Sequence, residues 1–455
     1  MPSTCLLWLR RDLRVHDHPA LQHAHAEFDV VVPVYVFDDA LLTVSEPRTA
    51  FLLGCLRALD EELGERGAGL VVRRGDPERA LAELAREIEA TAVLWTTDVA
   101  PYARARDRRV TEALRDAGVE PVPCPGTYVR DVSKVRRADG EPFVVFTPYW
   151  RAWQQLPARA VHGAPRALAP LPRGLDRGDL PEARPTAIAP GERAAREALR
   201  RWLSGPIDRY ADAHDTLAGG TSVLSPYLRW GCVSARECEQ RAVRRGTAGA
   251  EAWVRQLAWR DFFASVLLAH PETLHREFQA RYRDLDWHDD PEAYTAWRRG
   301  ETGFPVIDAA MRQLAETGWM HNRARMLVGS FLTKDLHLDW RLGERHFALL
   351  LVDGEPAQNV GNWQWIASTG VDPAPYFRRI FNPALQQRRF DPDGTYVRRW
   401  VPELGDVPIA HLAEPWAMTE REQRAAGCVI DHDYPAPIVD HAEERRRAIE
   451  RYRAV

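Results

Sequence analysis

The chain has 455 residues, 45% of them hydrophobic and 28% charged, with a net charge of −4. This length and composition predict a globular protein of two or three domains, and the slightly negative charge predicts no general affinity for nucleic acid. The six cysteines form no C-x-x-C pair, so neither a zinc site nor an iron–sulfur cluster is supported, and we expect no metal. No run of about 18 apolar residues occurs, which argues against a transmembrane helix. At the N-terminus a short apolar run precedes charged residues, the reverse of a secretory signal, so we expect a cytoplasmic protein.

The first third of the chain alternates short apolar segments with helical ones. We expect buried strands at 5–9, 30–37, 70–72 and 92–95. Helical apolar spacing follows at 48–63 and 77–89, and Pro101 opens a further helix. This alternation predicts a doubly wound parallel sheet with helices on both faces.

The rest of the chain has a different pattern. Residues 157–190 are rich in Pro, Ala, Gly and Arg, which is typical of a connector between domains. Beyond it, apolar residues recur at helical intervals and strand signals are scarce. We expect helices at 253–270, 305–317 and 322–338, within a mainly helical second domain.

The segment DGEPAQNVGNWQWIASTG, which begins at Asp353, combines acids, amides, glycines and tryptophans. Asp353 and Glu355 suit a ribose or another polar group, and the Asn359 amide both donates and accepts hydrogen bonds. Trp363 and Trp365 supply large aromatic faces. The segment suggests a planar, polar cofactor, although a capped loop followed by a Trp-rich core helix accounts for it equally well.

A second cluster lies in GGTSVLSPYLRWG. Its hydroxyls and backbone N–H groups at a helix start suit an anion, because the free N–H groups and the helix dipole both favour negative charge. The residues concerned are Thr221, Ser222, Leu224 and Ser225. A helix cap without a ligand is the alternative.

Two helical segments carry further candidates. In WVRQLAWRDFF four side chains share roughly one helical face and could frame a flat ligand such as a base: Trp253, Gln256, Trp259 and Arg260. A core helix with one buried Arg–carboxylate pair is the alternative. In GWMHNRARM, Asn322, Arg325 and Met326 lie on one stripe, and Arg325 could pair with Asp353.

Arginines are concentrated between Phe377 and Trp400. The segment contains six arginines but only two acidic residues, Asp391 and Asp393. The arginines are Arg378, Arg379, Arg388, Arg389, Arg398 and Arg399. A basic face on an acidic protein would bind phosphates in a salt-sensitive way, whereas a solvated surface is the alternative.

Taken in order, these segments resemble the photolyase/cryptochrome flavoprotein family, in particular its bacterial class I cyclobutane pyrimidine dimer photolyases. The similarity runs from LLWLRRDLRVHDHPAL to DYPAPIVDH, and the motifs TSVLSPYL, WRDFF, GFPVIDAAMRQL, GWMHNRARM, DGEPAQNVGNWQW and FNPALQ are jointly specific. The resemblance implies an α/β antenna domain at 1–130, an inter-domain linker at 131–195 and a helical FAD- and DNA-binding domain at 196–455. It also implies a monomer that needs no membrane and no obligate protein partner.

The resemblance assigns residues to a U-shaped FAD over a cavity that receives a flipped lesion. Those assigned to FAD are Tyr210, Thr221, Ser222, Val223, Leu224, Ser225, Trp253, Gln256, Arg260, Asn322, Arg325, Asp353, Gly354, Glu355 and Asn359. In this assignment Arg325 pairs with Asp353 beneath the isoalloxazine, and the Asn359 oxygen accepts a hydrogen bond from flavin nitrogen 5. Those assigned to DNA are Gln256, Trp259, Arg260, Asn322, Arg323, Met326, Trp365 and Gln386.

Trp287, Trp340 and Trp363 match the family's electron relay, in which a chain of indole rings divides one long electron transfer into short hops. The activity that the resemblance implies is light-driven repair of cyclobutane pyrimidine dimers in UV-damaged DNA. Excited, fully reduced FAD would donate an electron to the dimer and recover it after the ring splits, so the cofactor does the chemistry.

Two alternatives belong to the same family. A (6-4) photolyase would have histidines where this chain has Asn322 and Met326, which argues against it, although Gln256 is typical of such enzymes. His214 and Glu355 also depart from the family pattern and bear on substrate affinity. A cryptochrome-type blue-light photoreceptor often carries an added C-terminal tail, and only a short stretch follows DYPAPIVDH here.

A second, antenna chromophore is also implied. WTTDVAPYARARD resembles the deazaflavin-binding type, so Asp98, with Arg11 and Asp38, could contact an 8-hydroxy-deazaflavin. FMN, an empty pocket and ordinary loop and cap roles for these residues stay open.

Overall fold

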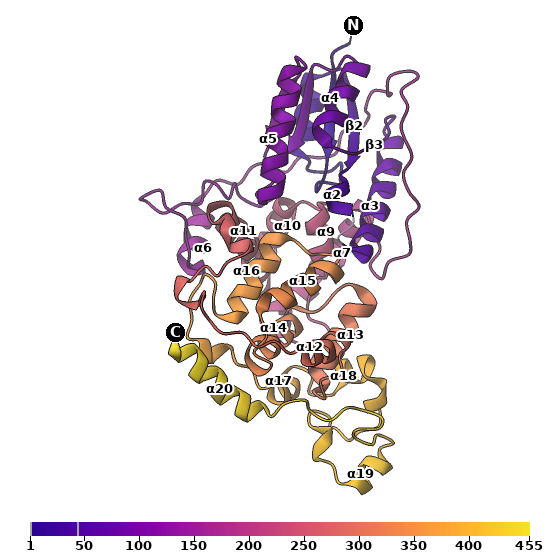
Figure 1. Ribbon diagram of the computed structural model, residues 1–455. Helices are drawn as coiled ribbons and strands as arrows, with labels where there is room; N and C mark the ends of the chain where they lie inside the picture. Colours follow the sequence, from indigo (N-terminus) through magenta and orange to yellow (C-terminus); the bar gives the residue numbers. More distant parts are fainter. Residues whose placement is uncertain (1, 43–44) are drawn as a thin grey trace. The chain divides into compact units, whose positions relative to one another are not determined.

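The computed structural model describes residues 2–42 and 45–455, which form two compact units that interleave along the chain (Figure 1). Unit 1 comprises Met1–Asp208, Ser222–Pro271 and Val352–Ala357. Unit 2 comprises Arg209–Thr221, Glu272–Leu351 and Gln358–Val455. These units follow contacts rather than chain order, and the domain bounds expected from the sequence stay a prediction.

Unit 1 contains a parallel five-stranded sheet of order β3-β2-β1-β4-β5. The strands are β1 (Thr4–Leu9), β2 (Val30–Phe37), β3 (Val71–Arg74), β4 (Ala92–Thr96) and β5 (Glu120–Cys124). The predicted parallel sheet is confirmed, and so are four of its strands. Edge strand β5, EPVPC, was missed because two prolines in five residues argue against a strand, and only an edge position tolerates them.

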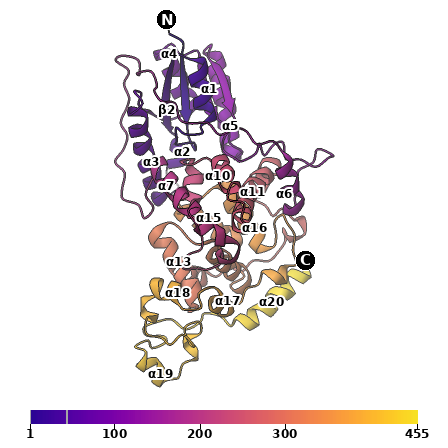
Figure 2. The ribbon, with the colours of Figure 1, turned by 180° about the vertical axis from the view of Figure 1, so that it is seen from behind.

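Helices cover both faces of this sheet, as predicted. Helices α4 and α5 pack against each other over one face (Figure 1), and α1 covers the opposite face, which is toward the viewer in Figure 2. The helices of the α/β part are α1 (Pro19–Glu27), α2 (Asp39–Leu42), α3 (Glu46–Gly64), α4 (Pro77–Glu87) and α5 (Pro101–Asp116). Apolar residues from the strands and from α4 and α5 form its core.

The remaining helices of unit 1 follow the sheet in the chain. They are α6 (Phe146–Gln155), α7 (Glu192–Leu203), α9 (Ser225–Trp230), α10 (Ala235–Val243) and α11 (Ala248–Ala269), with the 3₁₀ turn η1 (Pro206–Arg209) ending at the unit boundary. Helix α6 was not predicted. Between α6 and α7 the chain has no helix or strand, consistent with the Pro- and Gly-rich composition there.

Unit 2 is helical around one apolar core. Its helices are α8 (Tyr210–Ala213), α12 (Pro291–Arg299), α13 (Pro305–Thr317), α14 (Asn322–Ser330), α15 (Trp340–Leu350), α17 (Pro383–Phe390), α18 (Thr395–Trp400), α19 (Glu420–Ala425) and α20 (His441–Ala454). Short 3₁₀ turns complete it: η2 (Pro271–Leu274), η3 (Ala280–Tyr282), η5 (Tyr376–Arg379), η6 (Pro402–Leu404) and η7 (Pro415–Ala417). Helix α16 (Pro356–Ala367) begins in unit 1 and continues in unit 2, and none of the described helices is long and apolar enough to cross a membrane.

The helix expected at 322–338 does not run to its predicted end. Regular α14 stops at Ser330, a π-helical turn (Phe331–Asp335) follows, and His337 has a left-handed φ of 56°. All five residues of this turn are buried, so the segment resembles a continuing core helix in the sequence although the regular α-helix has ended.

Candidate functional site

The acidic segment Val352–Glu355 of unit 1 is held by the C-terminal end of α9. The Arg229 guanidinium donates to the Gly354 carbonyl at 2.8 Å, and the Trp230 indole donates to the Val352 carbonyl at 3.3 Å. Burial and the nearby Arg11 cation lower the pKa of Arg229 to about 9. The backbone of this segment is thus fixed by side chains that come from a distant part of the sequence.

Glu355 is the centre of a buried ionic network in unit 1. Its carboxylate, 3% exposed, pairs with Arg11 at 2.7 Å and Arg260 at 3.5 Å, and accepts a hydrogen bond from the Tyr128 hydroxyl at 3.2 Å. Burial alone would raise the pKa of Glu355, but the cations of Arg11, Arg260 and Arg229 lower it to about 2. This carboxylate is therefore ionised and occupied by three neighbours.

Two of the three residues predicted for an antenna chromophore belong to the same network. Arg11 also pairs with Asp98 at 2.9 Å, and burial opposed by Arg11 and Arg10 leaves the pKa of Asp98 well below its usual value. Asp98 lines a cavity of about 640 Å³ together with Tyr128. Asp38, in contrast, accepts a hydrogen bond from Tyr102 at 2.6 Å and has no bond to Arg11 or Asp98 in the described chain.

The predicted anion-binding residues adjoin α11 within unit 1. The Ser222 hydroxyl accepts hydrogen bonds from the Trp253 indole at 3.3 Å and from the Leu224 amide at 3.4 Å. Val223 has a φ of 51°, a conformation that is strained for a β-branched residue and is typical of functional loops. Ser225 then begins α9, so the predicted helix start is confirmed.

The α11 side chains do not share one environment, although the helix itself is confirmed. Trp253 and Arg260 are buried, whereas Gln256 is exposed. Arg260 donates to the carbonyls of Thr127 and Leu228, at 3.0 and 3.3 Å, besides facing Glu355. The Trp259 ring stacks on Phe146 of α6 with centroids 3.7 Å apart and planes 7° apart, so one of its faces is covered.

In unit 2, Asn359 is oriented by a residue that the sequence did not reveal. Its amide nitrogen donates to both the carbonyl (2.9 Å) and the carboxylate (2.7 Å) of Glu344 on α15. Both N–H groups of the amide are thereby used. The side-chain oxygen of Asn359 is therefore the atom that can accept a hydrogen bond from another group.

Trp363 packs against the same helix. A Cβ on Gly343 would overlap the six-membered ring of Trp363, so only glycine lets this ring lie on α15. Phe347 and Trp297 contact the ring edge to face, with centroids 5.0 and 6.3 Å away. Trp363 is 3% exposed, and its indole nitrogen has no hydrogen-bond partner in the described chain. An N–H left unpaired in a dry site is costly, which indicates a place where a bound group supplies the partner.

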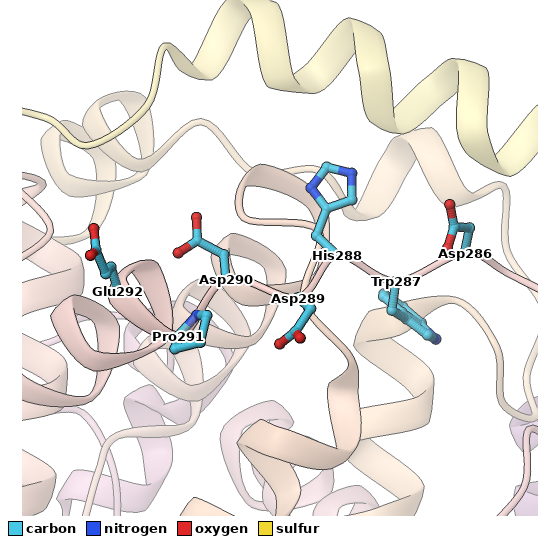
Figure 3. A pocket seen from close by; sticks show the side chains of 7 residues that line it. All are labelled: Asp286, Trp287, His288, Asp289, Asp290, Pro291 and Glu292. Atoms are coloured by element: carbon cyan, nitrogen blue, oxygen red, sulfur yellow. The ribbon is translucent and has the colours of Figure 1, made fainter.

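The other two relay candidates have different surroundings. Trp340 is fully buried and donates to the Glu277 carboxylate at 3.1 Å. Trp287 is partly buried, with the Arg451 guanidinium 5.2 Å from its ring centroid. It lines a cavity of about 610 Å³ formed by residues 286–292, shown in Figure 3.

Residues predicted to meet DNA also lie in unit 2. The Arg379 guanidinium stacks 3.8 Å from the Trp365 ring centroid and donates to the Trp365 carbonyl at 2.6 Å. Gln386 is partly buried, and its side-chain oxygen has no partner in the described chain. Of the six clustered arginines, Arg379 is buried, Arg388 pairs with Glu414, and Arg398 donates to three backbone carbonyls. The exposed arginines without an ion pair to a described residue are Arg378, Arg389 and Arg399.

The candidate residues on helix α14 have different surroundings. Asn322 is exposed, with its amide nitrogen 3.8 Å from the Met326 sulfur. Arg323 pairs with Asp215 at 2.5 Å, and Arg325 donates to the Met320 carbonyl at 2.8 Å. The remaining candidates of unit 2 are Tyr210, whose ring centroid lies 5.3 Å from that of His214, and Thr221.

Comparison with known proteins agrees with this geometry. Residues 5–172 match the family model for DNA photolyase, and residues 253–454 match the model for the FAD binding domain of DNA photolyase. A deoxyribodipyrimidine photo-lyase from Streptomyces griseus is 44% identical over 98% of this chain and 98% of its own length. The chain belongs to the DNA photolyase family.

Solved structures of photolyases have the same fold. A bacterial class III photolyase from Agrobacterium tumefaciens has a TM-score of 0.95 and 34% identity, covering 100% of this chain and 98% of its own. An archaeal photolyase from Sulfolobus tokodaii, solved with two FAD molecules, has a TM-score of 0.86 and 31% identity, covering 99% of this chain and 100% of its own. The class I resemblance seen in the sequence stays a prediction.

The residues present fit an FAD. In unit 2 the Trp363 indole nitrogen, which has no partner among the described residues, and the Asn359 oxygen are polar atoms available to a ligand. In unit 1 the Ser222 hydroxyl accepts a hydrogen bond from the buried Trp253, and the next residue, Val223, has a left-handed φ. This donor set suits a polar, planar cofactor with phosphates.

Proposed function

We propose that this protein is a deoxyribodipyrimidine photolyase, which uses light and reduced FAD to split cyclobutane pyrimidine dimers in UV-damaged DNA. The end-to-end match to the Streptomyces griseus photo-lyase carries the proposal, because it covers 98% of both chains. When bound and reduced, FAD supplies the electron that opens the dimer, and the protein supplies binding, orientation and electrostatics. DNA as the substrate is consistent with the cytoplasmic location expected from the sequence.

We assign the FAD contacts by the resemblance, and the geometry of each unit supports particular roles. Asn359 would present its oxygen to flavin nitrogen 5, because Glu344 holds the opposite end of the amide. Ser222 and Ser225 would bind phosphate oxygens, with Tyr210, Thr221, Val223 and Leu224 beside them. The roles of Arg325, Asp353 and Gly354 at the flavin follow the resemblance alone.

Glu355 has a different role in our proposal from the one that the resemblance implies. Its carboxylate is already paired with Arg11 and Arg260 and bonded to Tyr128. We infer that it fixes the backbone of the acidic segment, while Asp353 faces the cofactor. In this proposal Arg260 acts on the site indirectly, through its ion pair with Glu355.

Electron supply to oxidised FAD would run through Trp363, Trp340 and Trp287. The packing of Trp363 on Gly343 and the burial of Trp340 support this order, since both lie on α15 or against it. We assign the following residues to the lesion and its DNA: Trp365, Gln386, Gln256, Trp259, Asn322, Arg323 and Met326. Asn322 and Met326 carry no titratable group, which argues against the histidine-dependent (6-4) reaction.

For the antenna we propose a second chromophore in unit 1, and the two FAD molecules of the Sulfolobus tokodaii structure show that a family member holds a second flavin. An 8-hydroxy-deazaflavin near Arg11, Asp38 and Asp98 remains our preferred type, with FMN second. We further propose that the enzyme acts as a monomer.

The test is repair of defined lesions. The purified protein, with its flavin chemically reduced, is illuminated with oligonucleotides that carry one cyclobutane thymine dimer or one (6-4) product. We expect light-dependent recovery of normal thymines from the dimer alone, measured chromatographically against a dark control. Recovery from the (6-4) product instead, or no recovery with either lesion, would overturn the assignment.

A further inference from the structure

The Trp340 indole is in direct contact with a buried carboxylate. Its N–H donates to Glu277 at 3.1 Å, and Trp340 and Glu277 are 0% and 3% exposed. Glu277 lies 63 residues earlier in the chain, just beyond η2, and no motif of the sequence singled it out. An uncharged acceptor, such as a backbone carbonyl, would satisfy the same indole N–H without the cost of burying a charge.

Arg341 compensates this buried charge. Its guanidinium pairs with the second Glu277 oxygen at 2.9 Å and also bonds the Asp339 carboxylate at 3.1 Å. It donates to the His275 carbonyl at 2.9 and 3.1 Å as well. The carboxylate is therefore held in one position against the indole nitrogen.

The two charges act in opposite directions on an oxidised Trp340. Loss of one electron makes the ring a cation, which the Glu277 carboxylate attracts and the Arg341 guanidinium, 4.7 Å from the ring centroid, repels. The carboxylate is nearer and accepts the hydrogen bond of the N–H that becomes most positive. The Glu277 side chain is only 4% exposed, against 28% for the Arg341 side chain. Because solvent screens the arginine more, attraction by Glu277 dominates.

We propose that Glu277 is a positioning and electrostatic residue of the electron relay, which makes Trp340 easier to oxidise. In this step one electron passes from neutral Trp340 to the one-electron-oxidised Trp363, which returns to neutral indole while Trp340 becomes the cation. The indole proton stays on Trp340 in its hydrogen bond to Glu277, and the positive charge later leaves through Trp287 to an external thiol reductant. The inference rests on the proposed role of Trp340.

The first measurement is photoreduction of the oxidised holoenzyme under blue light with an external thiol. Glu277→Gln keeps the size and the hydrogen-bond acceptor but removes the charge, and it leaves the Arg341 cation over the ring with one carboxylate partner, Asp339, instead of two. We expect photoreduction to slow by about tenfold or more. Arg341→Gln removes the repulsive charge, and we expect equal or faster photoreduction despite the loss of an ion pair.

Slower photoreduction in Glu277→Gln without slowing in Arg341→Gln separates electrostatics from simple damage to the fold. A structural role alone would slow photoreduction in both variants, in proportion to their loss of stability. Asp339→Asn is the matched control, since it removes the other carboxylate on Arg341 without touching the indole and keeps a good helix cap. We expect its photoreduction to be unchanged.

A second readout needs no cofactor. In the apoprotein labelled with ¹⁵N at tryptophan, the Trp340 indole N–H signal is assigned by its absence from Trp340→Phe. A charged acceptor deshields this proton more than a neutral one, so we expect an upfield shift in Glu277→Gln and little change in Asp339→Asn. No shift would show that the contact is absent in solution and would overturn the proposal.

Trp340→Phe distinguishes failure of this inference from failure of the relay. If Trp340→Phe leaves photoreduction unchanged, Trp340 is not in the relay, and Glu277 loses its role with it. If Trp340→Phe blocks photoreduction while Glu277→Gln does not slow it, only the role of Glu277 is wrong. In the double variant, Glu277→Gln should add no further loss.

Discussion

At the residue scale, the acidic segment contains a carboxylate, Glu355, whose contacts hold together distant parts of the chain. Glu355 contacts Arg11, Arg260 and Tyr128, which lie far apart in the sequence. Removing one partner of such a buried pair leaves an uncompensated charge.

This network predicts a specific acid sensitivity. Because the folded-state pKa of Glu355 is about 2, against 4.5 ordinarily, its contribution is complete above the ordinary value and is lost as the pH falls through 4.5 toward 2. The loss amounts to about 3 kcal/mol of the free energy of unfolding. Urea unfolding at several pH values should show this decline in the wild type. Glu355→Gln should be less stable at pH 7 by a similar amount and should lack that part of the decline.

An exposed glutamate provides the comparison. Glu112→Gln on α5 should follow the wild-type profile at every pH. If Glu355→Gln also kept the full acid-dependent decline, the carboxylate would not be the group responsible.

At the element scale, the end of α16 explains a buried lysine. The last residue of α16, Ala367, has a carbonyl that accepts hydrogen bonds from the Lys334 amine at 2.8 Å and the Tyr452 hydroxyl at 2.6 Å. Lys334 lies in the π turn, is fully buried, and has its nitrogen 3.5 Å from the Tyr452 ring centroid. The π turn and α20 together satisfy a carbonyl that the helix itself leaves open.

Burying the Lys334 amine to make this hydrogen bond to Ala367 costs free energy of folding. Burial, with Arg379 and Arg451 nearby, lowers the pKa of Lys334 well below 10.5. Between the lowered folded pKa and the unfolded pKa, the unfolded chain binds a proton that the folded chain lacks, so wild-type stability rises with pH up to the unfolded pKa. Lys334→Met keeps the volume and leaves Tyr452 on Ala367. We expect it to raise the unfolding free energy by about 1–3 kcal/mol at pH 7, and this gain should shrink as the pH approaches 10.

Tyr452→Phe is the partner experiment. It keeps the lysine and removes the other hydrogen bond to Ala367, so it should lower stability by about 1 kcal/mol. A Lys334→Met protein less stable than wild type at every pH would mean that the amine contributes more through its bond than burial costs.

At the scale of the whole molecule, the sequence was sufficient where local pattern and motif decide. Apolar periodicity predicted the strands β1, β2, β3 and β4 and the helices α3, α4, α11 and α13, and the motifs pointed to the family. What it could not supply were partners distant in sequence. Glu344 for Asn359 and Glu277 for Trp340 lie 15 and 63 residues away, and only the tertiary fold brings them into contact. The sequence likewise offered six arginines either for phosphates or for a solvated surface, whereas in the fold three of them bond to other protein groups: Arg379, Arg388 and Arg398.

Because Arg379, Arg388 and Arg398 already bond to other protein groups, fewer arginines are left with which this acidic protein can bind DNA. Of the cluster between Phe377 and Trp400, the three exposed arginines Arg378, Arg389 and Arg399 are available for phosphates. Each phosphate contact releases about one counterion, so the slope of log K against log salt measures the number of such contacts. Replacing all three with Ala should weaken binding to a dimer-containing oligonucleotide and reduce the slope of log K against log salt by up to about 3.

The matched control removes the same charge from the surface of the α/β part of the chain. Arg86, Arg104 and Arg115, all exposed on α4 and α5, are replaced together with Ala. Fluorescence anisotropy over a range of salt concentrations then compares both triple variants with the wild type. If net charge alone governed binding, the two variants would lose affinity and slope equally. A larger loss in the Arg378, Arg389 and Arg399 variant would assign the phosphate contacts to that segment, and unchanged binding there would exclude it.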